Sequence, residues 1–130
     1  MKNDHENAPI INQLYTHFGE GNIEAVLGMM DANIVWNEST SSSYSDGNPY
    51  TSPGAVLNGV FARIGEDNEY FKLENIAVAE MGNDRVLATL NYNFKSKKTG
   101  EVQTTTVVHE WTIENKKIMA FQQYIGLGKQ

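Results

Sequence analysis

The chain has 130 residues, of which 40% are hydrophobic and 20% charged, a composition typical of a folded globular domain rather than of a disordered or fibrous chain. Sixteen acidic residues against ten basic ones give a net charge of −6, which disfavours binding to the phosphates of nucleic acids. The lack of cysteine excludes disulfide frameworks, thiol catalysis and cysteine-based metal centres.

Neither a secretion signal nor a membrane-spanning segment is predicted. Residues 1–9 are polar and acidic, without the apolar stretch of a signal peptide. No segment approaches the roughly 18 consecutive apolar residues that a membrane helix requires. We expect a cytoplasmic protein that binds neither membranes nor nucleic acids, with residues 1–7 as a flexible tail and residues 8–127 as a single domain.

Two helices are predicted near the start of the chain. The apolar residues between positions 10 and 18 recur at helical spacing, and this first helix is expected to end at Gly19 or Gly21. Asn22 is a suitable N-cap for the second helix, whose inward apolar residues extend to Met30.

A short strand, a long loop and a third helix follow. Residues 33–38 are rich in β-forming side chains, whereas residues 39–54 combine serine, glycine and proline without an apolar period. Such a long loop in a compact domain is typical of a lid or a mobile segment. Ser52 and Pro53 then serve as the N-cap and first residue of a helix that Gly65 ends.

The second half of the chain is predicted to consist of strands. They cover residues 70–81, 85–95, 101–113 and 117–125, and tight turns separate them. Two helices, a strand, a helix and a four-strand antiparallel meander predict an α+β domain with its helices on one face of a curved sheet.

This order and four short sequences resemble the SnoaL-like polyketide cyclase and ketosteroid isomerase group of the nuclear transport factor 2-like superfamily. The short sequences are GEGNIEAV (19–26), DANIVW (31–36), HEWTI (109–113) and KIMAFQQY (117–124). The resemblance implies a cone in which a curved antiparallel sheet and three N-terminal helices enclose a mostly apolar pocket. It also implies a homodimer that forms through the outer face of the sheet.

The resemblance does not decide the function, because the superfamily includes isomerases, cyclases, hydrolases, dehydratases and non-catalytic modules. Matched to the steroid isomerases, the positions of the helix tyrosine, the aspartate base and the protonated aspartate hold Leu14, Trp36 and His109. The position of the acid/base aspartate of the cyclases holds Gly126. The catalytic sets of these relatives are therefore missing, and the function must be argued from the pocket.

Strand parity predicts which side chains line that pocket. Placing Ile113 opposite Ile118 in the last hairpin brings His109 opposite Gln122, and a slip of one residue would turn the whole set outward. With the apolar faces of the helices and the first strand, this register predicts eight substrate-binding residues: Tyr15, Phe18, Trp36, Phe61, Tyr92, Trp111, Gln122 and Tyr124.

His109 and Glu38 are the candidate catalytic residues. His109 can act as a general acid or base or as a donor to an oxyanion, or it can be a structural histidine held by Gln122 or a backbone carbonyl. Glu38 shares a strand face with Trp36. If buried, it becomes a base near neutral pH, and otherwise it is a solvated carboxylate at a strand end.

Two functions follow from this pocket. One is the binding of a small apolar or aromatic molecule together with proton-transfer chemistry, such as isomerisation, cyclisation or dehydration. The other is a non-catalytic ligand-binding or dimerisation module. No cofactor is implied, and no group of His, Asp and Glu has the spacing of metal ligands.

Overall fold

The computed structural model describes residues 7–125. Of the predicted tail, only Asn7 is described, and it is the first residue of a helix. Residues 126 and 127 of the predicted domain lie outside the described residues, and so does the Gly126 position discussed above.

The first two helices form as predicted, but the second is shorter. Helix α1 (Asn7–Gly19) is followed by α2 (Ile23–Gly28), and the side chain of Asn22 caps α2 by accepting a hydrogen bond from the backbone N–H of Ala25. The predicted extension of this helix to Met30 is wrong. Met30 begins strand β1 (Met30–Asn37) and pairs with Ile118, so sheet pairing prevails over the helical spacing.

The third helix is continuous but contains a wide turn. It runs from α3 (Pro53–Val56) through the π-helical turn η2 (Leu57–Phe61) to α4 (Ala62–Asp67), two residues beyond the predicted end at Gly65. The ring of Tyr50 lies directly against Gly59, where any side chain would collide with it. Glycine within the wide turn therefore lets the preceding loop pack against this helix.

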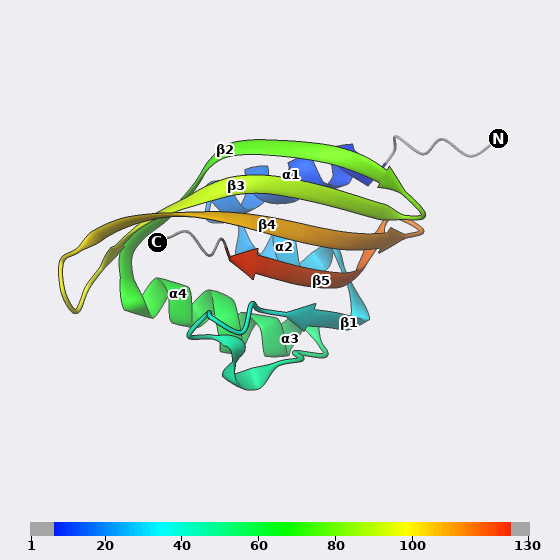
Figure 1. Ribbon diagram of the computed structural model, residues 1–130. Coiled ribbons are helices and arrows are strands. Elements are labelled where there is room, and N and C mark those ends of the chain that lie inside the picture. Colours follow the sequence, from blue (N-terminus) through cyan, green and yellow to red (C-terminus); the bar gives the residue numbers. More distant parts are fainter. Residues whose placement is uncertain (1–6, 126–130) are drawn as a thin grey trace.

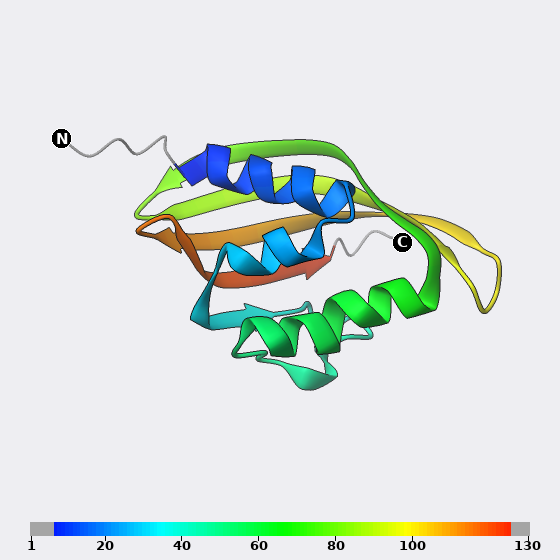
Figure 2. The same cartoon turned by 180° about the vertical axis from the view of Figure 1, so that it is seen from behind.

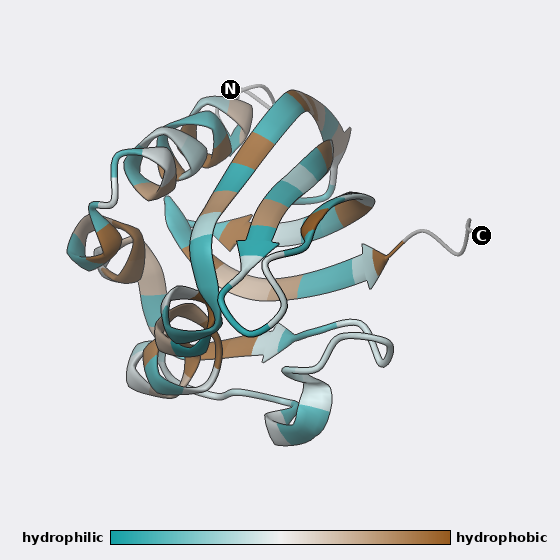
Figure 3. Cartoon of the chain, turned by 90° about the vertical axis from the view of Figure 1, so that its left-hand side faces the viewer, coloured by the Kyte–Doolittle hydropathy of each residue, from teal (hydrophilic) through white to brown (hydrophobic). Residues whose placement is uncertain are grey.

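The sheet has five strands in the order β1-β5-β4-β3-β2. Strands β2 (Asn68–Gly82), β3 (Arg85–Ser96), β4 (Val102–Glu114) and β5 (Lys117–Ile125) form the predicted antiparallel meander, and β1 pairs in parallel with β5. The sheet is curved, and the helices cover one of its faces (Figures 1 and 2). Hydrophobic and hydrophilic residues alternate along its strands (Figure 3), as a sheet with one covered face requires. The predicted α+β architecture is confirmed.

A β-bulge in the last hairpin changes the register. Ile113 pairs with Ile118 as predicted, but Thr112 pairs with Ala120, so that Met119 is the extra residue. Beyond the bulge, His109 lies opposite Gln123 instead of Gln122. The predicted register is therefore correct only at the turn end of the hairpin.

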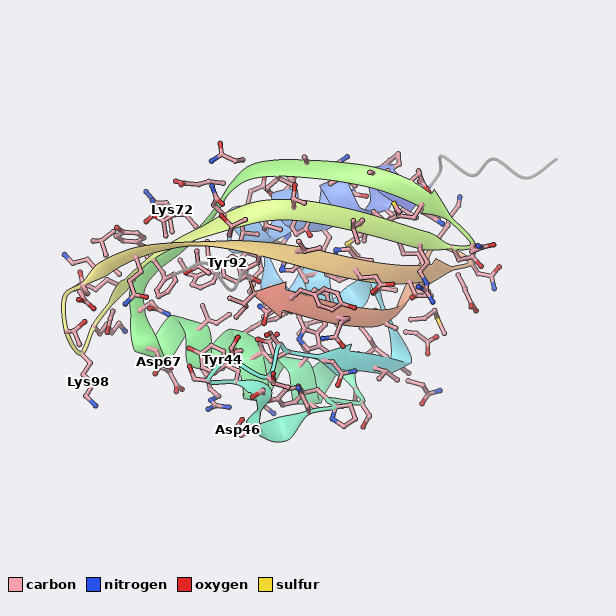
Figure 4. The ribbon with its side chains drawn as sticks, in the orientation of Figure 1. Tyr44, Asp46, Asp67, Lys72, Tyr92 and Lys98 are labelled. Carbon is pink, nitrogen blue, oxygen red and sulfur yellow. The ribbon has the colours of Figure 1, made fainter. Side chains whose placement is uncertain are left out.

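The long loop between β1 and α3 is tied to the domain at several points. Trp36 and Tyr50 exchange two backbone hydrogen bonds, of 2.8 and 2.9 Å. The hydroxyl of Tyr44 donates to Asp67 on α4 at 2.8 Å, and these two residues lie close together in Figure 4. Arg63 forms an ion pair of 2.9 Å with Asp46, which lies in the short 3-10 turn η1 (Ser45–Gly47).

Candidate functional site

A cavity of about 530 Å³ lies between the concave face of the sheet, the helices and the loop after β1. Both predicted catalytic residues, His109 and Glu38, line it. Aromatic rings form much of its wall. Six of the eight predicted substrate-binding residues are among its lining residues: Tyr15, Phe18, Trp36, Phe61, Tyr92 and Trp111.

Two of the predicted lining residues do not reach the cavity. Gln122 and Tyr124 follow the bulge and face the opposite side of the sheet, where Tyr124 is 47% exposed and donates to Glu110 at 2.9 Å. Phe121 and Gln123 take their places in the cavity wall. The placement of Gln122 and Tyr124 was wrong because alternation was assumed to continue through the bulge.

His109 lies between two tyrosine hydroxyls in the wall of the cavity. Its Nδ1 is 2.7 Å from the hydroxyl of Tyr15 on α1, and its Nε2 is 2.6 Å from the hydroxyl of Tyr92 on β3. We call these three residues the Tyr–His–Tyr triad. Because both ring nitrogens are engaged, the partners of His109 are the two phenols and not Gln122 or a backbone carbonyl.

Each phenol of the triad also accepts a hydrogen bond from a further side chain. The indole N–H of Trp111 donates to Tyr15 at 3.0 Å, and the amide of Gln123 donates to Tyr92 at 2.8 Å. The orientation of Gln123 is fixed, because its Oε1 accepts from the backbone N–H of Ser39 at 3.0 Å. Tyr15 and Tyr92 were predicted from the sequence only as parts of the cavity wall, not as hydrogen-bonding partners of His109.

Burial keeps the triad uncharged. It lowers the pKa of His109 to about 3, because a buried imidazolium would lose its hydration. Burial also raises the pKa of the Tyr15 and Tyr92 phenols, because it disfavours phenolate. At neutral pH the triad therefore consists of a neutral imidazole and two protonated phenols.

Glu38 is a second polar group of the cavity. Its side chain is 4% exposed, and its two carboxyl oxygens accept hydrogen bonds from the Trp36 indole at 2.8 Å and the Ser42 hydroxyl at 3.1 Å. Burial raises the pKa of Glu38, and the two hydrogen bonds oppose this shift. Glu38 is not a solvated carboxylate, because the loop after β1 folds over it.

The described residues give no indication of a metal site or a membrane span. Among residues 7–125, no three His, Asp or Glu side chains are grouped so that they could hold a metal ion. None of the helices in that range is both long and apolar enough to cross a membrane.

This curved sheet, with its helices on one face, has the nuclear transport factor 2-like fold. The sequence profile of the SnoaL-like domain matches residues 11–121, so the chain belongs to the SnoaL-like family. No curated protein matches the chain.

Solved structures agree with this assignment of the fold. A nuclear transport factor 2-like protein of Burkholderia thailandensis superposes with a TM-score of 0.80 at 23% identity, over 97% of this chain and 92% of that one. A candidate polyketide cyclase of Xanthomonas campestris gives 0.81 at 15% identity, over 96% and 94% of the two chains. TerC, co-crystallised with polyporic acid, gives 0.79 at 21% identity, over 92% and 91%.

Proposed function

We propose that the cavity binds a small, largely apolar carbonyl compound and that Glu38 catalyses proton transfer next to the carbonyl group. The observation that carries this proposal is the buried carboxyl of Glu38 in the same cavity as the neutral Tyr–His–Tyr triad. A base and a hydrogen-bond donor are the two groups that such a reaction requires. The similarity to a candidate polyketide cyclase supports the same class of chemistry.

The proposed step begins when the Glu38 carboxylate removes a proton from the carbon next to the carbonyl. The electron pair of that C–H bond moves into the carbonyl group, and negative charge develops on its oxygen. A hydrogen bond from the triad stabilises this oxygen. Return of this proton from Glu38 to the far carbon of an adjacent C=C bond gives isomerisation. Transfer of the proton to a hydroxyl group on the next carbon, which then leaves as water while the C=C bond forms, gives dehydration.

In this reaction His109 positions other groups rather than exchanging protons with solvent. A pKa of about 3 leaves the imidazole neutral at physiological pH, and both of its nitrogens contact the phenols. We therefore assign the general acid/base role to Glu38 instead of His109. Burial raises the pKa of Glu38 toward the neutral range.

The second candidate function is ligand binding without catalysis. It is favoured by the hydrogen bonds that already engage both nitrogens of His109 and both carboxyl oxygens of Glu38. In such a protein these groups would maintain the shape of the cavity, and a ligand would bind without exchange of its protons.

Deuterium exchange distinguishes the two functions. A panel of ketones that includes 2-acetylnaphthalene is incubated with the protein in D₂O, and NMR follows both binding and deuteration beside the carbonyl. We expect the native protein to accelerate deuteration and Glu38→Gln to reduce the rate at least 100-fold. Glu110→Gln on the outer face is the control and should not change the rate. Binding without deuteration would support the non-catalytic function.

We also propose a homodimer that forms through the outer face of the sheet. Exposed apolar side chains on this face, Val35 at 41% and Tyr124 at 47%, provide contact surface. Sedimentation at micromolar concentration should give twice the mass of one chain, and a single species with the mass of one chain would contradict the dimer.

A further inference from the structure

The Tyr–His–Tyr triad holds one more hydrogen-bonding proton than it has internal contacts. Two phenols and one neutral imidazole carry three such protons, whereas only two contacts link the ring to Tyr15 and Tyr92. The hydrogen bonds from Trp111 and Gln123 add donors to the phenol oxygens but no acceptor. One phenolic proton is therefore left for a group outside the triad.

Burial decides which phenol holds this extra proton. Tyr15 is 5% exposed, and its only hydrogen-bond acceptor among the described residues is Nδ1 of His109. A buried hydroxyl without an acceptor is unfavourable, so the proton of Tyr15 is directed to Nδ1. The ring proton of His109 then lies on Nε2 and is donated to Tyr92. Both tyrosines line the cavity, but Tyr92 is the more exposed of the two.

The oxygen of Tyr92 is consequently saturated as an acceptor. It accepts one hydrogen bond from Nε2 of His109 and a second from the amide of Gln123, which uses both of its lone pairs. Only its own proton remains available. This hydroxyl can donate a hydrogen bond into the cavity but cannot accept one from a ligand.

We propose that Tyr92 is the hydrogen-bond donor to the bound molecule, that Tyr15 and His109 are positioning residues that fix its proton, and that the group it meets is an uncharged carbonyl oxygen. This inference rests on the proposed function only in treating the cavity as a ligand site. The donor is on β3 (Arg85–Ser96), whereas the helix residue Tyr15 serves to orient the imidazole.

The charges around the cavity favour an uncharged ligand. Among the described residues, the cavity lining includes the carboxyl groups of Glu38, Asp67 and Glu101 but no lysine or arginine. A carboxylate or phosphate inside the cavity would lose its hydration and gain no opposite charge. A ketone carbonyl accepts the hydrogen bond of Tyr92 without this penalty.

Nitrogen-15 NMR of the ligand-free native protein tests the arrangement of protons. His109 is assigned by comparison with His109→Gln, and the shifts of its two ring nitrogens report which one is protonated. We expect a single neutral tautomer with the proton on Nε2 throughout pH 5–8. A proton on Nδ1, an equal mixture of tautomers or an imidazolium would overturn the inference. This measurement needs neither a ligand nor a folded variant with altered phenols.

Binding of three naphthalenes of matched shape tests the choice of donor and ligand. The probes are 2-acetylnaphthalene, the hydrocarbon 2-isopropylnaphthalene and the anion 2-naphthoate. Tyr92→Phe should lower the ratio of ketone to hydrocarbon affinity about fivefold, as expected for one lost hydrogen bond. The control variant Tyr124→Phe, which removes an exposed phenol outside the cavity, should leave this ratio within twofold, and naphthoate should bind at least tenfold more weakly than the ketone.

The outcomes separate this inference from the proposed function. An unchanged affinity ratio in Tyr92→Phe, an equal decrease in Tyr124→Phe, or naphthoate binding as tight as that of the ketone would overturn the inference while leaving a ligand site. Failure of all three probes to bind would instead contradict the proposed function, and the tautomer of His109 would still decide the arrangement of protons. Ketone binding without deuteration would contradict catalysis by Glu38 but not donation by Tyr92.

Discussion

The cavity has two polar regions, and burial acts on them in opposite directions. In the triad, burial lowers the pKa of His109 to about 3, whereas beside the loop it raises the pKa of Glu38. Both shifts favour the uncharged form of the side chain. The pKa of the imidazole thus lies below the physiological range, and His109 becomes a fixed hydrogen-bonding group. The pKa of the Glu38 carboxyl moves toward that range, which makes Glu38 a better base.

The two regions also differ in how the chain builds them. The triad joins side chains from α1, β3 and β4, with Tyr15 and His109 separated by 94 positions. The Glu38 region is local, because Trp36 is two positions away and Ser42 four. Loss of packing in the domain should therefore disrupt the triad, whereas changes in the loop after β1 should affect mainly Glu38.

The largest expected effect follows from removing the centre of the triad. His109→Ala leaves a void and deprives two buried phenols of a partner, so the free energy of unfolding should fall by about 2–4 kcal/mol. His17→Ala on α1 is the control, since no side-chain hydrogen bond satisfies its Nδ1, and should cost less than about 1 kcal/mol. Urea denaturation measures both. Equal losses in the two variants would show that the triad adds no stability of its own.

The second expected effect is a pH dependence of the unfolding free energy that arises from His109. Between pH 6.5 and 3 the unfolded histidine binds a proton that the folded one does not, so the folded state loses stability as the pH falls. This loss amounts to about 1.4 kcal/mol per pH unit. We expect the difference in unfolding free energy between the native protein and His109→Gln to decrease with this slope below pH 6.5. A difference independent of pH would mean that His109 titrates normally in the folded protein.

The sequence predicted those parts of the site that depend on local pattern. Helical spacing placed Tyr15 and Phe18 on the inner face of α1, and strand alternation placed His109 and Trp111 on the inner face of β4. The pairing partners in β5 were wrong because Met119 forms a bulge. The spacing of three between the apolar residues Ile118 and Phe121 was the available signal, since strict alternation requires an even number.

The polar contacts of the site could not be predicted from the sequence, because they depend on how separate parts of the chain meet in space. The sequence shows that Tyr15, Tyr92 and His109 can share a cavity, but hydrogen bonds of 2.6 and 2.7 Å depend on where three elements meet in space. The burial of Glu38 depends on the path of the loop, which has no periodic pattern. The hydroxyl of Ser42 and the side chain of Asn48 bring this loop onto Glu38.

The smallest expected effect is the stability change on replacing Glu38, and its sign is opposite to that of the His109 effect. As the pH rises above 4.5, the unfolded carboxyl ionises before the folded one does, so the native protein loses stability over this interval. Glu38→Gln removes this cost and keeps an oxygen that can accept from Trp36. The variant should therefore become more stable relative to the native protein as the pH rises above 4.5. Glu110→Gln on the outer face should show no such trend in parallel denaturations. A constant difference for Glu38→Gln would mean that its carboxyl ionises as it does in water, and Glu38 would then lose the raised pKa that supports its role as the base.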